Sequence, residues 1–234
     1  DNAAAITSGG DLKALVDGRY PWIELPDGYP PRSAVGYLFF GLLRLLEQFG
    51  VIPNQEAIVK RLLTKLETMK EHLSFNGQKN PAMQVASLMK DKIPLIYAGN
   101  PRLAALAYRW KCQINENAKY PAFFHVFSEM NHNEIEGWES TQYDNLFLPV
   151  LLTVENDEPP YRKRIGVFKT LLEKKEVPYI EFVAEGETVI EQFFQLGYTG
   201  DMISYYLGLA VRVNPTTINY IMFLKEELAK QGVS

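Results

Sequence analysis

The sequence predicts an α/β protein with a doubly wound parallel sheet, made of one nearly complete sheet domain and the tail of a preceding one. Three observations predict this class. From residue 92 to residue 234, short apolar segments bounded by glycine or proline alternate with longer segments of helical periodicity. Segments such as IPLIYAG are apolar almost throughout, as in strands buried on both faces of a parallel sheet. A single strand-turn-helix pattern precedes them at the amino end.

The amino-terminal segment AAAITSGGDLKALV predicts a short strand, a glycine-rich turn and a helix that begins at Asp11. One such repeat cannot bury both faces of a sheet, so we expect the chain to start partway through a larger protein. Two prolines then prevent a helix until Arg32. Residues 34–49 predict a helix with apolar residues around most of its circumference, which must be covered, with another subunit as one candidate.

A second long helix is predicted at residues 54–72, followed by a glycine- and proline-containing break and a short helix. Beyond it the strand and helix signals alternate. Strands are predicted in IPLIYAG, PAFFHVFS, LFLPVLLTV and PYIEFVAEG, and helices in RLAALAYRWKCQI and at residues 161–175, 187–211 and 217–230. We therefore assign residues 1–91 to the end of a first domain with linking helices, and residues 92–234 to a second domain with a carboxyl-terminal helix.

Composition excludes several classes of partner. With 47% hydrophobic residues, 22% charged residues and a net charge of -4, the chain is typical of a globular protein without an arm for nucleic acid. The single cysteine, Cys112, excludes an internal disulfide framework and suits a reducing cytoplasm. No apolar run approaches the roughly 20 residues that span a bilayer, so we expect no membrane insertion. The expected location is the cytoplasm.

Ligands of open parallel sheets bind beyond the carboxyl ends of the strands. We therefore expect functional groups after IPLIYAG and in the segment SEMNHNEIEGW, residues 128–138, which follows the strand PAFFHVFS. The helix end NENAK is expected to join them. The titratable groups predicted to gather there are Glu116, Lys119, Glu129, His132, Glu134 and Glu136.

Two of these groups are candidates for proton transfer. Glu116 is flanked by Asn115 and Asn117, poor helix residues that compete for backbone hydrogen bonds and indicate a positioned carboxylate; periodicity alone favours a solvated acid at a helix end. His132 is either a group that exchanges protons near neutral pH or a cap of the next helix. One histidine with scattered acids is weak evidence for zinc, so no metal site is expected.

Two cations are further candidates, each with an ordinary alternative. Arg32 follows two prolines that fix its backbone, as in a guanidinium held for bidentate contact with an anion, or it is a surface arginine at a helix start. Lys225, in the terminal helix, is by default a solvated lysine paired with glutamates on neighbouring turns.

Five motifs follow one another along the chain: TSGG, GYPPRSAVGYLFF, INENAKYP, EMNHNEIEGW and VNPTTINYIMFLKEEL. Together they resemble the bifunctional phosphoglucose/phosphomannose isomerase family, which is built from two sugar isomerase (SIS) domains. The resemblance covers essentially all of this chain and the carboxyl-terminal two-thirds of a full-length member. It implies a SIS-type fold and aldose–ketose isomerisation of hexose 6-phosphates through a cis-enediol, in glycolysis and gluconeogenesis. It also implies that no metal or organic cofactor is required.

The resemblance implies a role for each candidate residue. Glu116 matches the base that moves a proton between sugar carbons C2 and C1, and His132 matches the histidine that opens the ring. Arg32 matches the arginine that stabilises the enediolate, and Lys225 matches a lysine that assists ring opening. In the family the histidine reaches the site from the other subunit, which implies a homodimer. Asn131 and its neighbour Asn133 are expected to fix the histidine ring.

The sequence also departs from the family. Its Gly-Ser-rich and Ser-Gly-Asn-Thr phosphate loops do not occur in these 234 residues, so we expect little or no isomerase activity for this chain alone. Ile218 stands where some members carry a threonine that admits both C2 epimers, which leaves mannose 6-phosphate use open. Two other classes stay open: a non-catalytic SIS module that binds sugar phosphates, and a truncated dimerising fragment.

Overall fold

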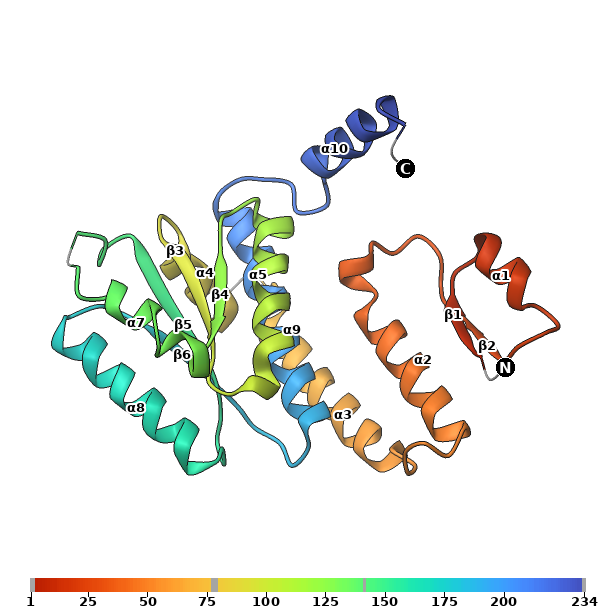
Figure 1. Cartoon of the computed structure of the whole chain (residues 1–234), viewed down its shortest axis with the longest axis horizontal. Helices are drawn as coiled ribbons and strands as arrows, with labels where there is room; N and C mark the ends of the chain where they lie inside the picture. The colour runs from red at the N-terminus through yellow and green to blue at the C-terminus, as the bar shows by residue number, and fades with distance from the viewer. Residues whose placement is uncertain (1–2, 77–79, 141, 233–234) are drawn as a thin grey trace. The chain divides into compact units, whose positions relative to one another are not determined.

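The chain forms two compact units, Asp1–Arg61 and Leu62–Ser234 (Figure 1). The computed structural model describes residues 3–76, 80–140 and 142–232. Across these ranges no helix combines the length and the apolar character that crossing a membrane requires.

The first unit contains the predicted strand, turn and helix. Its strands pair in parallel, and the hydroxyl of Thr7 accepts a hydrogen bond from the amide of Gly9 (3.2 Å) in the turn between strand and helix. The elements are β1 (Ala5–Thr7), α1 (Gly10–Val16), β2 (Trp22–Glu24), the 3₁₀ turn η1 (Pro31–Ser33) and α2 (Val35–Gln48).

Helix α2 keeps much of its apolar surface uncovered. Leu45 is its buried side chain, whereas Leu38 and Leu42 are 44% and 50% exposed. The expectation that another subunit covers this helix stays a prediction.

The second unit is a four-stranded sheet with every pair parallel, in the order β4-β3-β5-β6, which confirms the predicted sheet type. Figure 1 shows α4, α5 and α9 on one side of this sheet and α7 and α8 on the other. The strands are β3 (Ile93–Ala98), β4 (Phe123–Val126), β5 (Phe147–Val154) and β6 (Ile180–Ala184). The helices are α4 (Pro81–Met89), η2 (Pro101–Leu103), α5 (Ala104–Ala118), α6 (Phe127–Met130), α7 (Glu134–Gly137), α8 (Pro159–Lys174), α9 (Val189–Ala210) and α10 (Asn219–Lys230).

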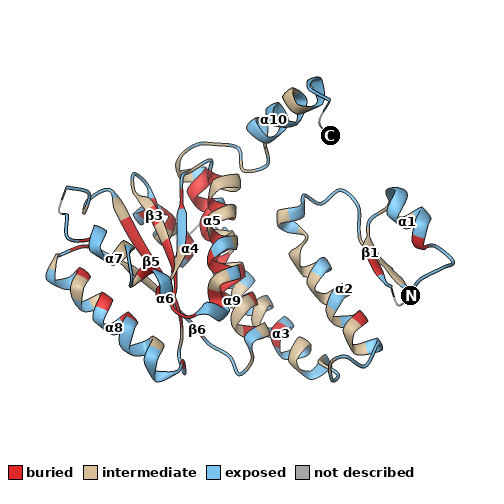
Figure 2. Ribbon diagram, viewed as in Figure 1, coloured by how far each residue is buried: buried red, intermediate tan, exposed pale blue. Residues whose placement is uncertain are grey.

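Each face of this sheet carries its own apolar core. Along β3, the side chains of Ile96 and Ala98 join the core under α4, α5 and α9, and Tyr97 joins the opposite core under α8. The buried residues gather along the central strands and on the facing sides of these helices (Figure 2). Burial on both faces explains why IPLIYAG lacks the alternation of a half-exposed strand.

Close packing of α5 against α9 fixes the rotation of α5. A Cβ added to Gly200 would come within 2.3 Å of the Trp110 ring, so glycine is required at this contact. The indole nitrogen of Trp110 donates a hydrogen bond to the carbonyl oxygen of Leu196 (2.9 Å). These contacts hold the helix that carries Glu116.

Three findings differ in detail from the sequence-based expectations. The strand predicted at residues 121–128 ends at Val126, because Phe127 and Met130 turn into the core under α8 as part of α6. The helix α3 (Glu56–Leu73) begins in the first unit and continues into the second. Helix α4 packs in the core of the second unit, so this compact unit begins ahead of the boundary predicted at residue 92.

Candidate functional site

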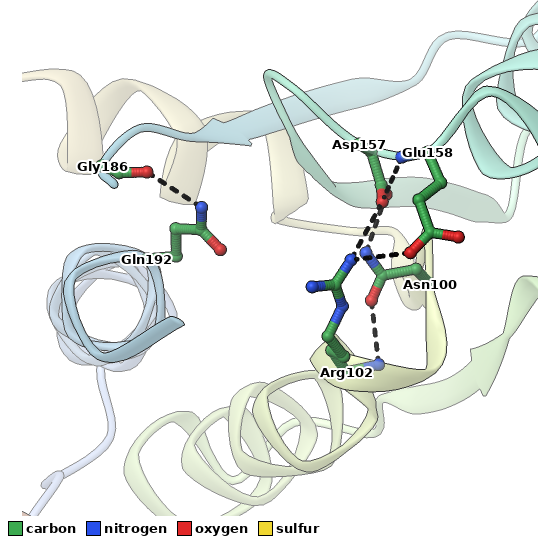
Figure 3. Close-up of polar contacts among 6 residues, drawn as sticks. All are labelled: Asn100, Arg102, Asp157, Glu158, Gly186 and Gln192. Atoms are coloured by element: carbon green, nitrogen blue, oxygen red, sulfur yellow. Dashed lines mark hydrogen bonds and ion pairs between the residues drawn. The ribbon is translucent and has the colours of Figure 1, made fainter. Parts of the chain in front are cut away.

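The carboxyl ends of β3 and β5 lie at the point where the chain leaves the sheet in opposite directions, the usual ligand position in this fold class. Figure 3 shows a closed group of polar side chains there. The amide nitrogen of Asn100 donates to the carboxylate of Asp157 (2.7 Å), and both residues are buried. The guanidinium of Arg102 lies 3.8 Å from Asp157 and 3.4 Å from Glu158. We call this group the Asn100–Asp157 clasp.

The charge of the clasp disfavours a sugar phosphate. Two carboxylates flank Arg102, and a phosphate dianion placed beside them would be repelled. The clasp joins the loops after β3 and β5, and its charge makes it better suited to stability than to anion binding.

Figure 3 also shows a separate contact near the start of α9, where Gln192 donates a hydrogen bond to the carbonyl oxygen of Gly186 (3.0 Å).

Asp157→Ala is expected to lower the free energy of unfolding by about 2–4 kcal/mol, because it leaves the buried amide of Asn100 without its acceptor. The matched control is Glu158→Ala, at a side chain that is 65% exposed, with an expected change within about 0.5 kcal/mol. Urea denaturation followed by circular dichroism compares the two. Equal effects of the two variants would contradict this role of the clasp.

Glu116 lies at the opposite edge of the sheet. Helix α5 runs from the carboxyl end of β3 back to the amino end of β4, so its last turn lies where the strands begin. His132 comes after β4, which spans roughly 10 Å between the two residues at about 3.3 Å per residue. The prediction that Glu116 and Lys119 gather with His132 and its neighbours within one chain was wrong, since helix α5 reverses the chain direction between the two segments.

Hydrogen bonds anchor the helix end around Glu116. The side chain of Asn115 donates to the carbonyl oxygen of Tyr120 (2.8 Å), and that of Asn117 donates to the hydroxyl of Ser204 on α9 (2.9 Å). One asparagine therefore bonds the backbone just beyond the helix, and the other bonds the neighbouring helix α9. They fix the turn that carries the half-buried Glu116.

The segment between α6 and α7 presents His132 at the surface. Asn133 caps α7 by accepting from the amide of Glu134 (2.6 Å), and its amide nitrogen donates to Glu129 (3.1 Å). The expectation that Asn131 and Asn133 fix the histidine ring was wrong: among the residues that the structure describes, neither side chain is hydrogen-bonded to it. The side-chain oxygen of Asn133 accepts the hydrogen bond that caps α7 instead.

A buried tyrosine anchors the same segment from below. Tyr97 donates a hydrogen bond to the carboxylate of Glu134, and burial raises the pKa of the Tyr97 hydroxyl above its ordinary value. The Tyr97 ring lies edge-on to Phe127 and Phe168, with centroids 6.0 Å and 5.6 Å away. Tyr97 was missed in the sequence, although a tyrosine in an apolar buried strand signals a hydrogen-bond partner for its hydroxyl.

The remaining candidates lie in separate parts of the chain. Arg32 is half-buried in η1 of the first unit, and Lys225 is exposed on α10 in the second. The segment that leads into α10 begins at Asn214, whose side chain accepts from the amide of Thr216 (2.9 Å). Pro215 in this segment accepts a hydrogen bond from Lys119 (3.4 Å), next to Glu116. Glu116 and the start of the segment that leads to Lys225 are thus neighbours.

The candidate groups of the second unit are acids, bases and cations. Among the described residues, no cluster of three or more histidine, cysteine or carboxylate side chains could hold a metal ion. At the end of α5, the carbonyl oxygens of Glu116 and Pro215 both accept hydrogen bonds from the ammonium of Lys119.

The chain is similar to known proteins over nearly its whole length. A protein from Caldicellulosiruptor bescii, "Bifunctional phosphoglucose/phosphomannose isomerase", is 35% identical over 231 residues, which are 97% of this chain and 68% of that protein. A "D-glucosamine-6-phosphate 4-epimerase" from Sulfolobus acidocaldarius is 36% identical over 148 residues, 63% of this chain and 45% of that protein. A solved structure of a glucose-6-phosphate isomerase like protein from Thermus thermophilus shares the fold, with a TM-score of 0.59 and 21% identity over 90% of this chain and 73% of that one.

The model of the family "Bacterial phospho-glucose isomerase C-terminal SIS domain" matches residues 78–228. This range contains the sheet of the second unit, the helix end at Glu116 and the segment at His132. The chain therefore belongs to the bifunctional phosphoglucose/phosphomannose isomerase family, whose carboxyl-terminal SIS domain it contains.

Proposed function

We propose that the protein is a hexose 6-phosphate isomerase that interconverts glucose 6-phosphate and fructose 6-phosphate through a cis-enediol. The observation that carries this proposal is the helix end at Glu116, where two asparagines anchor the turn that carries this residue, beside the segment that leads to Lys225. Family membership supports an isomerase of phosphosugars.

In the proposed reaction, the carboxylate of Glu116 takes the proton from C2 of the open-chain aldose and returns it to C1. A positioned base typically contributes about 10²- to 10⁴-fold. The guanidinium of Arg32 stabilises the negative oxygen of the enediolate, an electrostatic contribution that is often the largest in such reactions. Lys225 and His132 exchange protons with the ring oxygen and the anomeric hydroxyl, which opens the ring. The chemistry uses side chains, without a cofactor.

The proposed active unit is a homodimer that acts in the cytoplasm. His132 and Glu116 of one chain lie at opposite ends of β4, which supports a site that takes its histidine from a second copy. The exposed position of His132 on an anchored segment suits such a donation. The uncovered apolar side chains of α2 are candidate dimer surface.

A non-catalytic sugar-phosphate sensor is the alternative. The carboxylates of Asp157 and Glu158 disfavour a phosphate at the carboxyl edge of the sheet for both functions, so the clasp does not separate them. The distinction is turnover, since a sensor binds hexose phosphates without converting them.

The direct test is an assay of the natural full-length protein on glucose 6-phosphate, mannose 6-phosphate and glucosamine 6-phosphate. We expect formation of fructose 6-phosphate from glucose 6-phosphate. We expect slower use of mannose 6-phosphate, because Ile218 stands where some members of the family carry a threonine. Binding of all three without conversion of any would refute the proposal.

Arg32→Lys is expected to lower kcat by roughly tenfold with KM changed less, because lysine keeps the charge and loses the planar pair of donors. The matched control is Arg44→Lys on α2, whose guanidinium pairs with Glu47 (3.0 Å), with kcat unchanged. Steady-state kinetics on fructose 6-phosphate measures both. Full activity of Arg32→Lys would remove the assigned bidentate role.

A further inference from the structure

We propose that Lys119 is a positioning residue that ties Glu116 to the segment leading into α10. This inference rests on the proposed function, since it assigns to Lys119 the relative placement of the base and of the helix that carries Lys225. Three observations carry it: the backbone conformation of Lys119, the two carbonyl groups that its ammonium contacts, and the close packing of the same helix end on α9.

Lys119 stands in a backbone conformation that lysine adopts rarely. It ends α5 with φ 53° and ψ 37°, in the left-handed region. Glycine or asparagine is the usual residue at this position of a helix, because a Cβ is strained there. A side-chain contact made in this conformation offsets part of the strain.

The ammonium of Lys119 supplies that contact and reaches a distant part of the chain. It donates to the backbone carbonyl oxygen of Glu116 (2.5 Å), and a cation is favourable at the carboxyl end of a helix. It also donates to the carbonyl oxygen of Pro215 (3.4 Å). One side chain therefore bridges the turn that carries the proposed base and the segment that enters α10.

The opposite side of this helix end is already fixed by close packing. A Cβ added to Gly208 on α9 would lie 2.7 Å from the carbonyl oxygen of Asn117, so the two backbones touch. Asn117 also holds Ser204 through its side chain. Helix α5 is thus held on α9 without Lys119, and the lysine adds the link to the 214–218 segment.

This geometry separates stability from activity. Lys119→Gly relieves the strained conformation and keeps the packing on α9, so we expect thermal stability equal to or above that of the unchanged protein. The same change removes the link that the Lys119 ammonium makes between the Glu116 turn and Pro215. We expect kcat to fall roughly 10- to 100-fold, with KM changed by less than about threefold, because small misplacement of a base is costly.

The experiment compares three variants in the natural full-length protein, with kcat, KM and melting temperature as readouts. Lys119→Arg keeps a cation of similar reach and is expected to retain most of kcat. Glu176→Gly is the matched control, because Glu176 has the same left-handed conformation (φ 57°) at the end of α8. It is expected to leave kcat unchanged. Amide exchange at residues 214–218 is expected to rise in Lys119→Gly alone.

Three results would overturn the proposal: full kcat in Lys119→Gly, equal losses in Lys119→Gly and Lys119→Arg, or unfolding of Lys119→Gly. Glu116→Gln is assayed beside them to separate this inference from the proposed function. Full activity of Glu116→Gln would defeat the proposed function, whereas an inactive Glu116→Gln with a fully active Lys119→Gly would defeat the positioning role only.

Discussion

Replacing Glu116 with glutamine is expected to lower kcat for glucose 6-phosphate by about 10²- to 10⁴-fold, with KM little changed. Glutamine has the same shape and leaves the hydrogen bonds of Asn115 and Asn117 in place, so the helix end should keep its position. An amide cannot take the C2 proton. Exchange of that proton with deuterated solvent should be lost together with turnover.

The matched control for Glu116→Gln is Glu226→Gln, at an exposed acid on α10, with kcat unchanged. Circular dichroism and melting temperature establish that both variants fold. A Glu116 variant that retains kcat within about threefold, or that still exchanges the C2 proton, would remove Glu116 as the base.

Replacing His132 with alanine is expected to lower kcat by about 10²-fold, because ring opening loses its proton-exchanging group. The imidazole is exposed and the segment is anchored by Glu134 on Tyr97, so the change should leave the fold intact. His72→Ala, at an exposed position of α3, is the control. An active His132→Ala would show that the segment has another role.

The fold class could be predicted because local signals agreed with the packing. The apolar run that became β3 is buried on both faces, and the glycine-rich turn before α1 fell where expected. The asparagines around Glu116 indicated hydrogen bonding by their residue type, and each makes a side-chain hydrogen bond to a group outside its own turn. Periodicity and residue chemistry are properties of neighbouring positions, which a sequence displays directly.

The edge of the sheet at which each candidate lies required the three-dimensional path of the chain. Glu116 and His132 are close in sequence, yet β4 separates them. The contact between Lys119 and Pro215 joins residues 96 positions apart, and the sequence around either residue does not predict it. The same holds for the hydrogen bond between Asn100 and Asp157, which joins the loops after two different strands.

The most direct test of the account is complementation between Glu116→Gln and His132→Ala in one dimer. The two variants are produced together with different affinity tags, and the mixed dimer is purified through both. If each histidine serves the partner's site, one site of the mixed dimer carries both changes and the other carries neither. We predict about half the activity of the unchanged dimer, far above either variant alone. A mixed dimer as inactive as its parents, or failure to obtain any dimer, would contradict the account.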